Sequence, residues 1–304
     1  MELKINEIRQ HSRQLVREID LVKGSYLDTG YTFSQCHVLF ELSVNKSLNL
    51  LAIADNLLID KSNASRTVKQ LTELGLVTAE RVASDNRQKL FSLTDKGTKA
   101  LGVTLHLANK QVEDALGILN EDQQELVIQG IQLYADALKK SRLQSHYTIR
   151  SIQKRDNDQV AHLIRTVMTE FRAVGAGYSI GDSEVDDMYG SYRDKRSCYY
   201  VITSGDRVVG CGGLGPLDGG NKFTCEIRKM FFLRETRGIG LGQRLMLLLL
   251  NEARTRDYKK CYLETLGRMW RAQELYQKNG FQLLEKPMGK TGHDSCDRWY
   301  LLLL

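Results

Sequence analysis

The spacing of apolar residues changes near residue 144, and this change constrains the fold more than any other feature of the sequence. Before it, apolar side chains recur every three or four residues, as in amphipathic helices. After it, short apolar runs alternate with helical stretches, which predicts an α/β domain. A chain of 304 residues is long enough for two domains. We expect a mainly α domain over 1–143, a polar linker over 144–147 and an α/β domain over 148–304.

The first part shows an ordered succession of expected elements. Its spacing predicts a hairpin over 76–93 with a charged tip at Ser84-Asp85-Asn86-Arg87. Gly75 would end the preceding helix in a left-handed conformation. Two short helices followed by a hairpin describe a winged helix-turn-helix, in which the second helix enters the major groove of DNA. The expected helices lie at 3–27, 33–42, 48–57, 62–74, 95–119 and 121–143.

The helix expected at 62–74 carries the candidate DNA contacts. Its inward face would hold Val68, Leu71 and Leu74, with Asp60 or Ser62 as the N-cap. Arg87 at the tip of the wing could enter a minor groove. Residues 61–99 hold 8 Lys or Arg against 4 Asp or Glu, which suits a phosphate-contacting surface and equally a solvated mixed-charge one. The candidate base and phosphate contacts on the helix are Ser62, Asn63, Ser65, Arg66, Thr67 and Lys69.

The run DKSNASRTVKQLTELGLVTAERVASDNRQKLFSLTDKG at 60–97 resembles the MarR family of bacterial transcription regulators, over roughly 1–143. The resemblance implies a homodimer held by the first and last helices, with one reader helix and one wing on each half-site of double-stranded DNA. It also implies control by an effector whose identity no residue gives. Cys36 is either a redox trigger, as in some relatives, or a packed thiol among apolar neighbours; we favour the packed thiol.

A glycine-rich loop in the second part carries its strongest local chemistry. The segment Arg234–Arg244 follows an expected strand at 227–233 and opens an expected helix at 240–254. Gly238, Gly240 and Gly242 let backbone N–H groups approach an anion without a Cβ in the way. The partial positive charge of the helix N-terminus adds to this, so the loop suits a pyrophosphate. The loop lacks the G-K-[ST] ending of a Walker motif.

Four segments together resemble the GNAT family of N-acetyltransferases over roughly 148–304. They are CEIRKMFFL (225–233), RGIGLG (237–242), CYLET (261–265) and AQELYQKNGF (272–281), and Arg237, Gly240 and Gly242 match the family's R-x-x-G-x-G signature. The resemblance implies an α/β fold with a mixed central sheet. It also implies that the chain transfers an acetyl group from acetyl-CoA to an amine. The strand backbone would hold the pantetheine arm and the loop the pyrophosphate. These implied coenzyme contacts are Met230, Phe231, Phe232, Leu233, Arg237, Gly238, Ile239, Gly240, Leu241 and Gly242.

Acetyl transfer needs a neutral amine and a proton for the departing thiolate. Tyr276 matches the family's usual acid, although an amphipathic Tyr can also simply cover a core. Glu226 matches the base at the start of the central strand; Glu264 on the neighbouring strand is a rival, and period-2 alternation leaves open which face meets the cleft. The segment 267–271 lacks the Asn that many relatives carry there, so its contacts to the coenzyme arm are open.

Other polar residues of the second part have weaker interpretations. Asp182, Glu184, Asp186 and Asp187 could attract a cationic amine or form a solvated loop. The C-terminal segment 287–300 resembles a subgroup of the GNAT family. Within it, His293 and Cys296 lack a clear third metal ligand, so we expect a structural loop near the acceptor pocket and no metal.

Cysteine usage and hydropathy point to a reduced cytoplasmic protein. The six cysteines form no C-x-x-C pair, no apolar run is longer than the six residues of Leu245–Leu250, and no signal-like segment opens the sequence. We rank a bifunctional regulator and acetyltransferase first. The second hypothesis is a regulator whose GNAT domain senses acetyl-CoA without turnover. The third is an enzyme that its MarR part only dimerises.

Overall fold

The computed structural model describes residues 2–82 and 85–304, without the side chains of 82 and 85–88. The chain divides into two compact units, Met1–Gln129 and Gly130–Leu304. The long helix α6 (Glu121–Gln144) crosses the boundary between them. None of the helices in the described ranges is long and apolar enough to cross a membrane.

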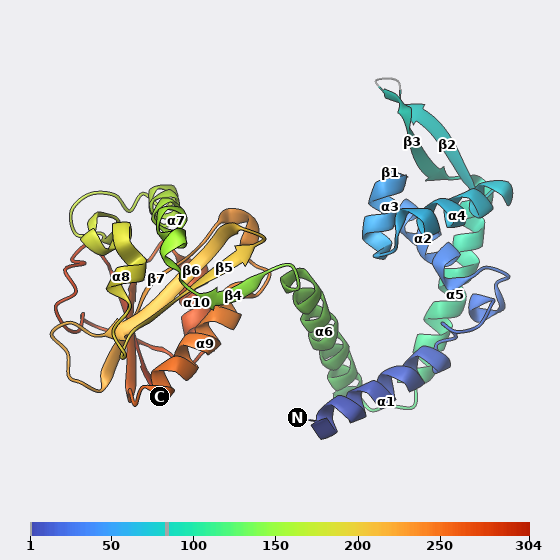
Figure 1. The fold of residues 1–304 in the computed structure, drawn as a ribbon. Coiled ribbons are helices and arrows are strands. Elements are labelled where there is room, and N and C mark those ends of the chain that lie inside the picture. The colour runs from blue at the N-terminus through green and yellow to red at the C-terminus, as the bar shows by residue number, and fades with distance from the viewer. Residues whose placement is uncertain (1, 83–84) are drawn as a thin grey trace. The chain divides into compact units, whose positions relative to one another are not determined.

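The first unit is mainly helical with a small three-stranded sheet (Figure 1). The strand order is β1-β3-β2, and both pairings are antiparallel. Its elements are α1 (Glu2–Glu18), the 3-10 helix η1 (Tyr26–Asp28), α2 (Phe33–Asn45), β1 (Ser47–Asn49), α3 (Leu50–Leu57), α4 (Lys61–Glu73), β2 (Val77–Val82), β3 (Asp85–Leu93) and α5 (Asp95–Leu116).

Side-chain caps fix the starts of these helices. Asp60 accepts a hydrogen bond from the backbone N–H of Asn63 at 2.8 Å, so Asp60 is the N-cap of α4. Thr94 caps α5 in the same way through Gly97, at 3.0 Å. Gly75 has φ +71°, the left-handed conformation expected after α4.

Three details differ from the expectations. The first helix ends at Glu18 and not near Leu27, since Asp20 and Leu27 both have positive φ, which interrupts a helix. The expected helix at 48–57 begins at Leu50, because residues 47–49 pair with β3. Leu74 is 43% exposed and not part of the inward face, since it lies at the C-cap of α4. The core there takes Ala64, Val68 and Leu71 instead.

The second unit is built on a seven-stranded mixed sheet with the order β4-β5-β6-β7-β8-β10-β9. All neighbouring strands are antiparallel except β7 and β8, which are parallel. Its strands are β4 (Thr148–Ser151), β5 (Cys198–Ser204), β6 (Arg207–Pro216), β7 (Thr224–Phe232), β8 (Lys260–Thr265), β9 (Gln282–Leu284) and β10 (Arg298–Leu303). Its helices are η2 (Lys154–Asp156), α7 (Asn157–Glu170), η3 (Ser179–Gly181), η4 (Ser183–Asp187), α8 (Met188–Ser191), η5 (Arg234–Thr236), α9 (Leu241–Thr255) and α10 (Trp270–Lys278).

Two apolar cores lie on opposite faces of this sheet. α7 and α8 contribute to one core, where Val160, Ile164 and Met188 are fully buried. α9 and α10 contribute to the other, which includes Leu245, Leu249 and Tyr276. The first part of the chain is thus mainly α with a wing, and the second is an α/β fold with a mixed sheet, as the sequence predicts.

Candidate functional site

A cavity of about 1160 Å³ opens where β7 and β8 separate. The two strands pair in parallel only where Thr224–Glu226 of β7 lies beside Lys260–Tyr262 of β8. Farther along, β7 continues beside β6 and β8 continues beside β10. Side chains from both strands line the gap, so the divergence creates a cleft through the middle of the sheet.

A β-bulge shapes the wall that β7 contributes. Cys211 on β6 faces Phe231 and Gly213 faces Arg228, so Lys229 and Met230 together oppose the single residue Gly212. Lys229 has φ +48°, a conformation unusual for a residue with a side chain. Its carbonyl accepts a hydrogen bond from the Tyr199 hydroxyl at 3.0 Å. The bulge interrupts the ladder beside the cavity, which Met230 and Phe231 border.

The glycine-rich loop lies at one end of the cavity and leads into α9. Gly238 and Gly240 have φ +81° and +88°, and Gly240 is the N-cap of the helix. Gly238, Gly240 and Gly242 all border the cavity. A helix N-terminus with two left-handed glycines before it can present several N–H groups to an anion.

Only some of the coenzyme residues that the resemblance implies border the cavity. Leu233, Ile239 and Leu241 are not among the residues that border the cavity, and Leu241 is fully buried in the core. Those that border it are Met230, Phe231, Phe232, Arg237, Gly238, Gly240 and Gly242.

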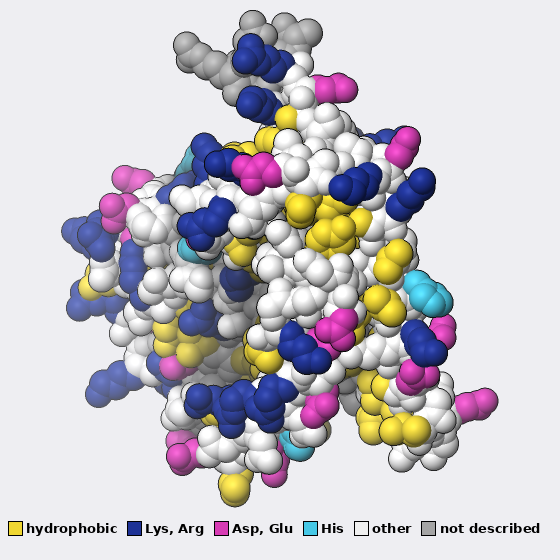
Figure 2. All heavy atoms as spheres, turned by 90° about the vertical axis from the view of Figure 1, so that its right-hand side faces the viewer, with side chains coloured by type: hydrophobic (Ala, Val, Ile, Leu, Met, Phe, Trp, Pro, Cys, Tyr) yellow, Lys and Arg dark blue, Asp and Glu magenta, His cyan; other side chains and the backbone are white. Residues whose placement is uncertain are grey.

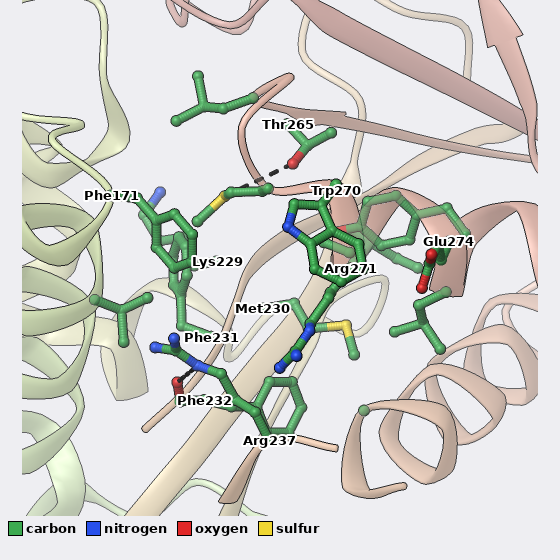
Figure 3. A pocket seen from close by; sticks show the side chains of 18 of the residues that line it. Phe171, Lys229, Met230, Phe231, Phe232, Arg237, Thr265, Trp270, Arg271 and Glu274 are labelled. Atoms are coloured by element: carbon green, nitrogen blue, oxygen red, sulfur yellow. Dashed lines mark hydrogen bonds between the residues drawn. The ribbon is translucent and has the colours of Figure 1, made fainter. Parts of the chain in front are cut away.

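The Arg237 guanidinium is occupied by the protein itself. Both its terminal nitrogens donate to the Glu170 carboxylate at 2.7 Å, and Nε donates to the Phe232 carbonyl at 2.8 Å. This pairing lowers the pKa of Glu170 below its ordinary value. Arg237 therefore fastens the loop to α7. Figure 3 shows it below Phe171, with Trp270 and Arg271 of α10 bordering the same space.

Tyr276 and Glu226 border the same cavity. Tyr276 is 7% exposed, and burial raises the pKa of its hydroxyl to about 12. Glu226 is 3% exposed and accepts a hydrogen bond from Arg228 Nε at 2.7 Å. Burial raises the pKa of Glu226, while Arg228 opposes that rise. A hydroxyl that stays protonated and a carboxyl with raised basicity are what an acid and a base need.

Glu264 faces the cavity as well, so the two candidate bases lie on one site. Its carboxylate accepts hydrogen bonds from the Tyr262 hydroxyl at 2.7 Å and from the Thr291 hydroxyl at 3.0 Å. His293 Nδ1 lies 3.5 Å from Glu264. The Glu264 carboxylate thus has more donors around it than the Glu226 carboxylate.

A charged cluster joins three separate segments beside these carboxylates. His293 Nε2 lies 3.0 Å from Asp182, and Lys229, with a side chain 2% exposed, pairs with Asp182 at 2.7 Å and also with Glu184. The hydrogen bonds to Asp182 and Glu264 raise the pKa of His293 to about 9. The cluster ties the C-terminal loop and the loop before α8 to the bulged strand.

The four acidic residues expected to meet solvent or a substrate are engaged within the protein. Asp182 and Glu184 hold Lys229. Asp186 pairs with Arg165 at 2.7 Å, and Asp187 accepts from Asn157 and from the Gly190 N–H. We therefore assign them a structural role in this loop.

Glu226, Glu264 and His293 each offer one atom within 4.8 Å of the others, a spacing that could hold a metal ion. Both ring nitrogens of His293 already face carboxylates, so a cation there would compete with the imidazole proton. Burial raises the pKa of the Cys296 thiol to about 12, which disfavours a thiolate ligand or nucleophile. These contacts describe a hydrogen-bonded cluster around His293, and the absence of a metal stays a prediction.

In the first unit, α4 presents a mixed polar and basic surface. Ser62, Ser65, Arg66 and Lys69 are exposed and border a shallow hollow with Leu50 and Lys61. Asn63 Nδ2 donates to Asp60, and Thr67 Oγ1 donates to the Asn63 carbonyl, so these two side chains are partly used within the helix. The side chain of Arg87 lies outside the described residues.

Cys36 is 4% exposed, and its Sγ lies 3.9 Å from the Thr104 hydroxyl. Burial raises the pKa of its thiol. This environment favours the packed thiol over the redox trigger.

The winged helix and the split-sheet cavity define the chain as a winged helix-turn-helix module joined to an α/β domain of the acyltransferase type. Residues 160–281 match the acetyltransferase (GNAT) family, and residues 29–88 match the MarR family. The chain belongs to the GNAT family through its second unit and carries a MarR-family helix-turn-helix domain in its first.

Individual relatives resemble one part of the chain each. The N-acetyltransferase YjgM of Escherichia coli is 36% identical over 150 residues, which cover 49% of this chain and 90% of that protein. The HTH-type transcriptional regulator SAV2265 of Staphylococcus aureus is 24% identical over 103 residues, or 29% of this chain and 70% of that protein. A solved GNAT-family acetyltransferase from Staphylococcus aureus has a TM-score of 0.46 and 18% identity, covering 51% and 97%.

Local sequence patterns do not single out several residues of the site. Lys229 lies in the middle of an expected strand, and no local pattern distinguishes a buried, bulged lysine from an exposed one. Trp270 and Arg271 occupy the segment where the expected Asn is absent, and both border the cavity. An apolar and a basic side chain at the start of a helix, next to a coenzyme motif, were the available signal for them.

Proposed function

We propose that this chain is a bifunctional regulator: its MarR-like part binds double-stranded DNA as a homodimer, and its GNAT part transfers an acetyl group from acetyl-CoA to an amine. The observation that supports the enzymatic half best is that one cavity collects the anion-binding loop, the bulged strand, Tyr276 and Glu226. A pocket that joins a phosphate site to an acid and a base suits a thioester donor.

Different segments of the cavity wall would bind different parts of the coenzyme. The N–H groups at Gly238–Gly242 would hold the diphosphate at the N-terminus of α9. The bulged segment Met230–Phe232 would run beside the pantetheine arm. Trp270 and Arg271 lie where an Asn is expected, and they would contact the arm from the opposite wall (Figure 3).

The chemical step follows from the positions of the two proton-handling groups. The neutral amine attacks the thioester carbonyl, forming the C–N bond, and Glu226 takes the proton that the nitrogen loses. The C–S bond then breaks, and Tyr276 donates its proton to the departing sulfur of CoA. The raised pKa of each group keeps Tyr276 protonated and makes Glu226 a stronger base than an exposed carboxylate.

The first unit supports the regulatory half. The surface of α4 carries Arg66 and Lys69 beside small polar side chains, a set suited to phosphates and base edges. Apolar side chains of α1 and α6 remain exposed, including Leu3 and Ile8 on α1 and Leu126 and Leu133 on α6. Such unpartnered helix faces fit a dimer formed by the first and last helices.

A screen for thiol release tests the enzymatic proposal. The full-length protein is supplied with acetyl-CoA and a panel of small amines, amino-acid-like metabolites and lysine peptides, with acetyl-CoA alone as the control for hydrolysis. Amine-dependent release of CoA is expected. Acetyl-CoA binding without release for any amine would instead support the sensor, and no binding would end the enzymatic half.

A further inference from the structure

The last turn of α6 lies against the glycine-rich loop of the second unit. Gln144 Nε2 donates a hydrogen bond to the Ile239 carbonyl at 2.9 Å. A Cβ added to Gly240 would lie 2.6 Å from the same Gln144 nitrogen and 3.7 Å from Lys140 Cδ. Lys140 and Gln144 border the cavity together with Gly238 and Gly240. No motif accounts for these two residues.

The Gln144 contact fixes the direction of one N–H group of the loop. In a planar trans peptide, the carbonyl oxygen and the amide hydrogen point in opposite directions. Holding the Ile239 carbonyl toward Gln144 therefore turns the Gly240 N–H away from Gln144. Both Gly238 and Gly240 have left-handed φ, and glycine imposes little restraint of its own. Gln144 supplies a restraint that the loop sequence lacks.

Lys140 lies one helical turn before Gln144, on the same face of α6. In the described parts of the chain it forms no ion pair with a carboxylate. Arg237, the cation of the loop itself, is committed to Glu170 through two hydrogen bonds. Arg234, Arg271 and Lys278 border the cavity as well. Lys140 is the cation on the same helix face as Gln144, and its Cδ lies 3.7 Å from the position that a Cβ on Gly240 would take, so it is placed to contact a phosphate at the loop.

We propose that the last turn of α6 forms part of the acetyl-CoA phosphate site, with Gln144 positioning the loop and Lys140 contacting a phosphate. The inference rests on the proposed function, since it assigns these residues to the same coenzyme. Lys140 and Gln144 belong to the second compact unit, Gly130–Leu304, together with the loop.

Isothermal titration of the full-length protein with acetyl-CoA tests the assignment. Gln144→Ala should weaken binding about tenfold, because the Gly240 N–H, which would donate to a phosphate of the coenzyme, loses its restraint. Lys140→Ala should weaken it about threefold and make it less sensitive to salt, as for an exposed charge. Lys139→Ala, a neighbouring exposed lysine that does not border the cavity, is the matched control and should bind as the wild type does.

A shorter donor separates a phosphate contact from general damage to the helix. S-acetylpantetheine lacks the diphosphate, so its KM should be the same in wild type, Gln144→Ala and Lys140→Ala. If the wild type binds acetyl-CoA and both variants bind it with the same affinity, the inference about α6 is overturned while the proposed function stands. An equal loss with both donors would also overturn it, because it would indicate structural damage. A wild type that binds no acetyl-CoA would overturn the proposed function and this inference with it.

Discussion

At the scale of single residues, burial and pairing determine what each charged group of the site can do. Tyr276 and Glu226 are buried beside the cavity, and both have a raised pKa. Burial raises the pKa of Tyr276 and Glu226 by disfavouring their charged forms. The pKa of His293 is raised by two carboxylates, which stabilise its charged form. The motifs around Tyr276 and Glu226 made both predictable. His293 could be predicted as part of a loop near the acceptor pocket, but its partner Asp182 lies 111 residues away and no local pattern joins them.

The Tyr276 hydroxyl is proposed to protonate the thiolate of CoA. Tyr276→Phe removes the proton and keeps the ring in its contacts with Phe281 and Tyr300. We expect kcat to fall about 100-fold, with little change in KM for acetyl-CoA or in thermal stability. Steady-state kinetics on the best amine measures this, and an unchanged kcat would remove Tyr276 from the mechanism.

The two carboxylates can be separated by their pH profiles. Glu226→Gln should lower kcat about 100-fold and abolish the acid limb of the pH-rate profile, which in the wild type lies above the ordinary range of a carboxyl because the pKa of Glu226 is raised. Glu264→Gln is the matched control and should keep that limb. Loss of the limb in Glu264→Gln, with retention in Glu226→Gln, would transfer the role of base to Glu264.

The His293 cluster predicts a pH-dependent stability. The pKa of His293 rises from 6.5 to about 9 on folding. Its stabilisation is therefore complete below about pH 6.5 and is lost as the pH rises through about 9. Urea unfolding should show the wild type losing on the order of 2 kcal/mol over this interval, after allowance for solvent screening. His293→Gln should lack this pH dependence, and an identical dependence in both proteins would contradict the assignment.

At the scale of elements, local signals located most helices and strands, and tertiary pairing determined the exceptions. The capping residue Asp60 and the left-handed Gly75 bracket α4, as the sequence predicts. The bulge in β7 could not be predicted, because it arises from its register against β6. The three-residue strand β1 is likewise defined by pairing, here with β3. Its sequence alone continues the apolar pattern of α3, which predicts a helix.

The surface of α4 makes a prediction about salt. Arg66 is exposed and borders the hollow on α4. If it contacts a phosphate, Arg66→Ala should reduce the slope of log affinity against log salt by about 1. Arg13 on α1 is also exposed and serves as the control, whose replacement by Ala should leave the slope as it is. Fluorescence anisotropy with a duplex operator, found by selection from random sequence, provides the measurement. Equal slopes for wild type and Arg66→Ala would argue against α4 as the reader.

At the scale of the whole molecule, the sequence predicts two kinds of fold in one chain, because the two motif sets are local and lie apart. The apolar surface of α1 and α6 is the larger-scale feature that local patterns do not explain. No residue of either helix is buried, and Leu3, Leu126 and Leu133 are 79%, 69% and 74% exposed. Figure 2 shows apolar side chains on the surface among charged ones. A second copy of the chain would cover such faces.

A charge on this surface should weaken the dimer. Leu133→Glu places a carboxylate where an apolar contact is expected, and burying an unpaired charge is costly. Light scattering after size exclusion should give a dimer for the wild type and a monomer for this variant, with weaker DNA binding. The neighbouring Gln132→Glu is the control and should remain dimeric. A monomeric wild type would contradict the proposed homodimer, and a dimeric Leu133→Glu would place the dimer contact elsewhere.

The loop at the start of α9 is proposed to hold the diphosphate of acetyl-CoA. A crystal structure of the full-length protein with CoA tests this proposal. We expect the diphosphate over the N–H groups of Gly238–Gly242, with the thiol end directed between β7 and β8 toward Tyr276. A coenzyme bound elsewhere, or a loop that stays closed by the protein's own side chains at saturating CoA, would contradict it.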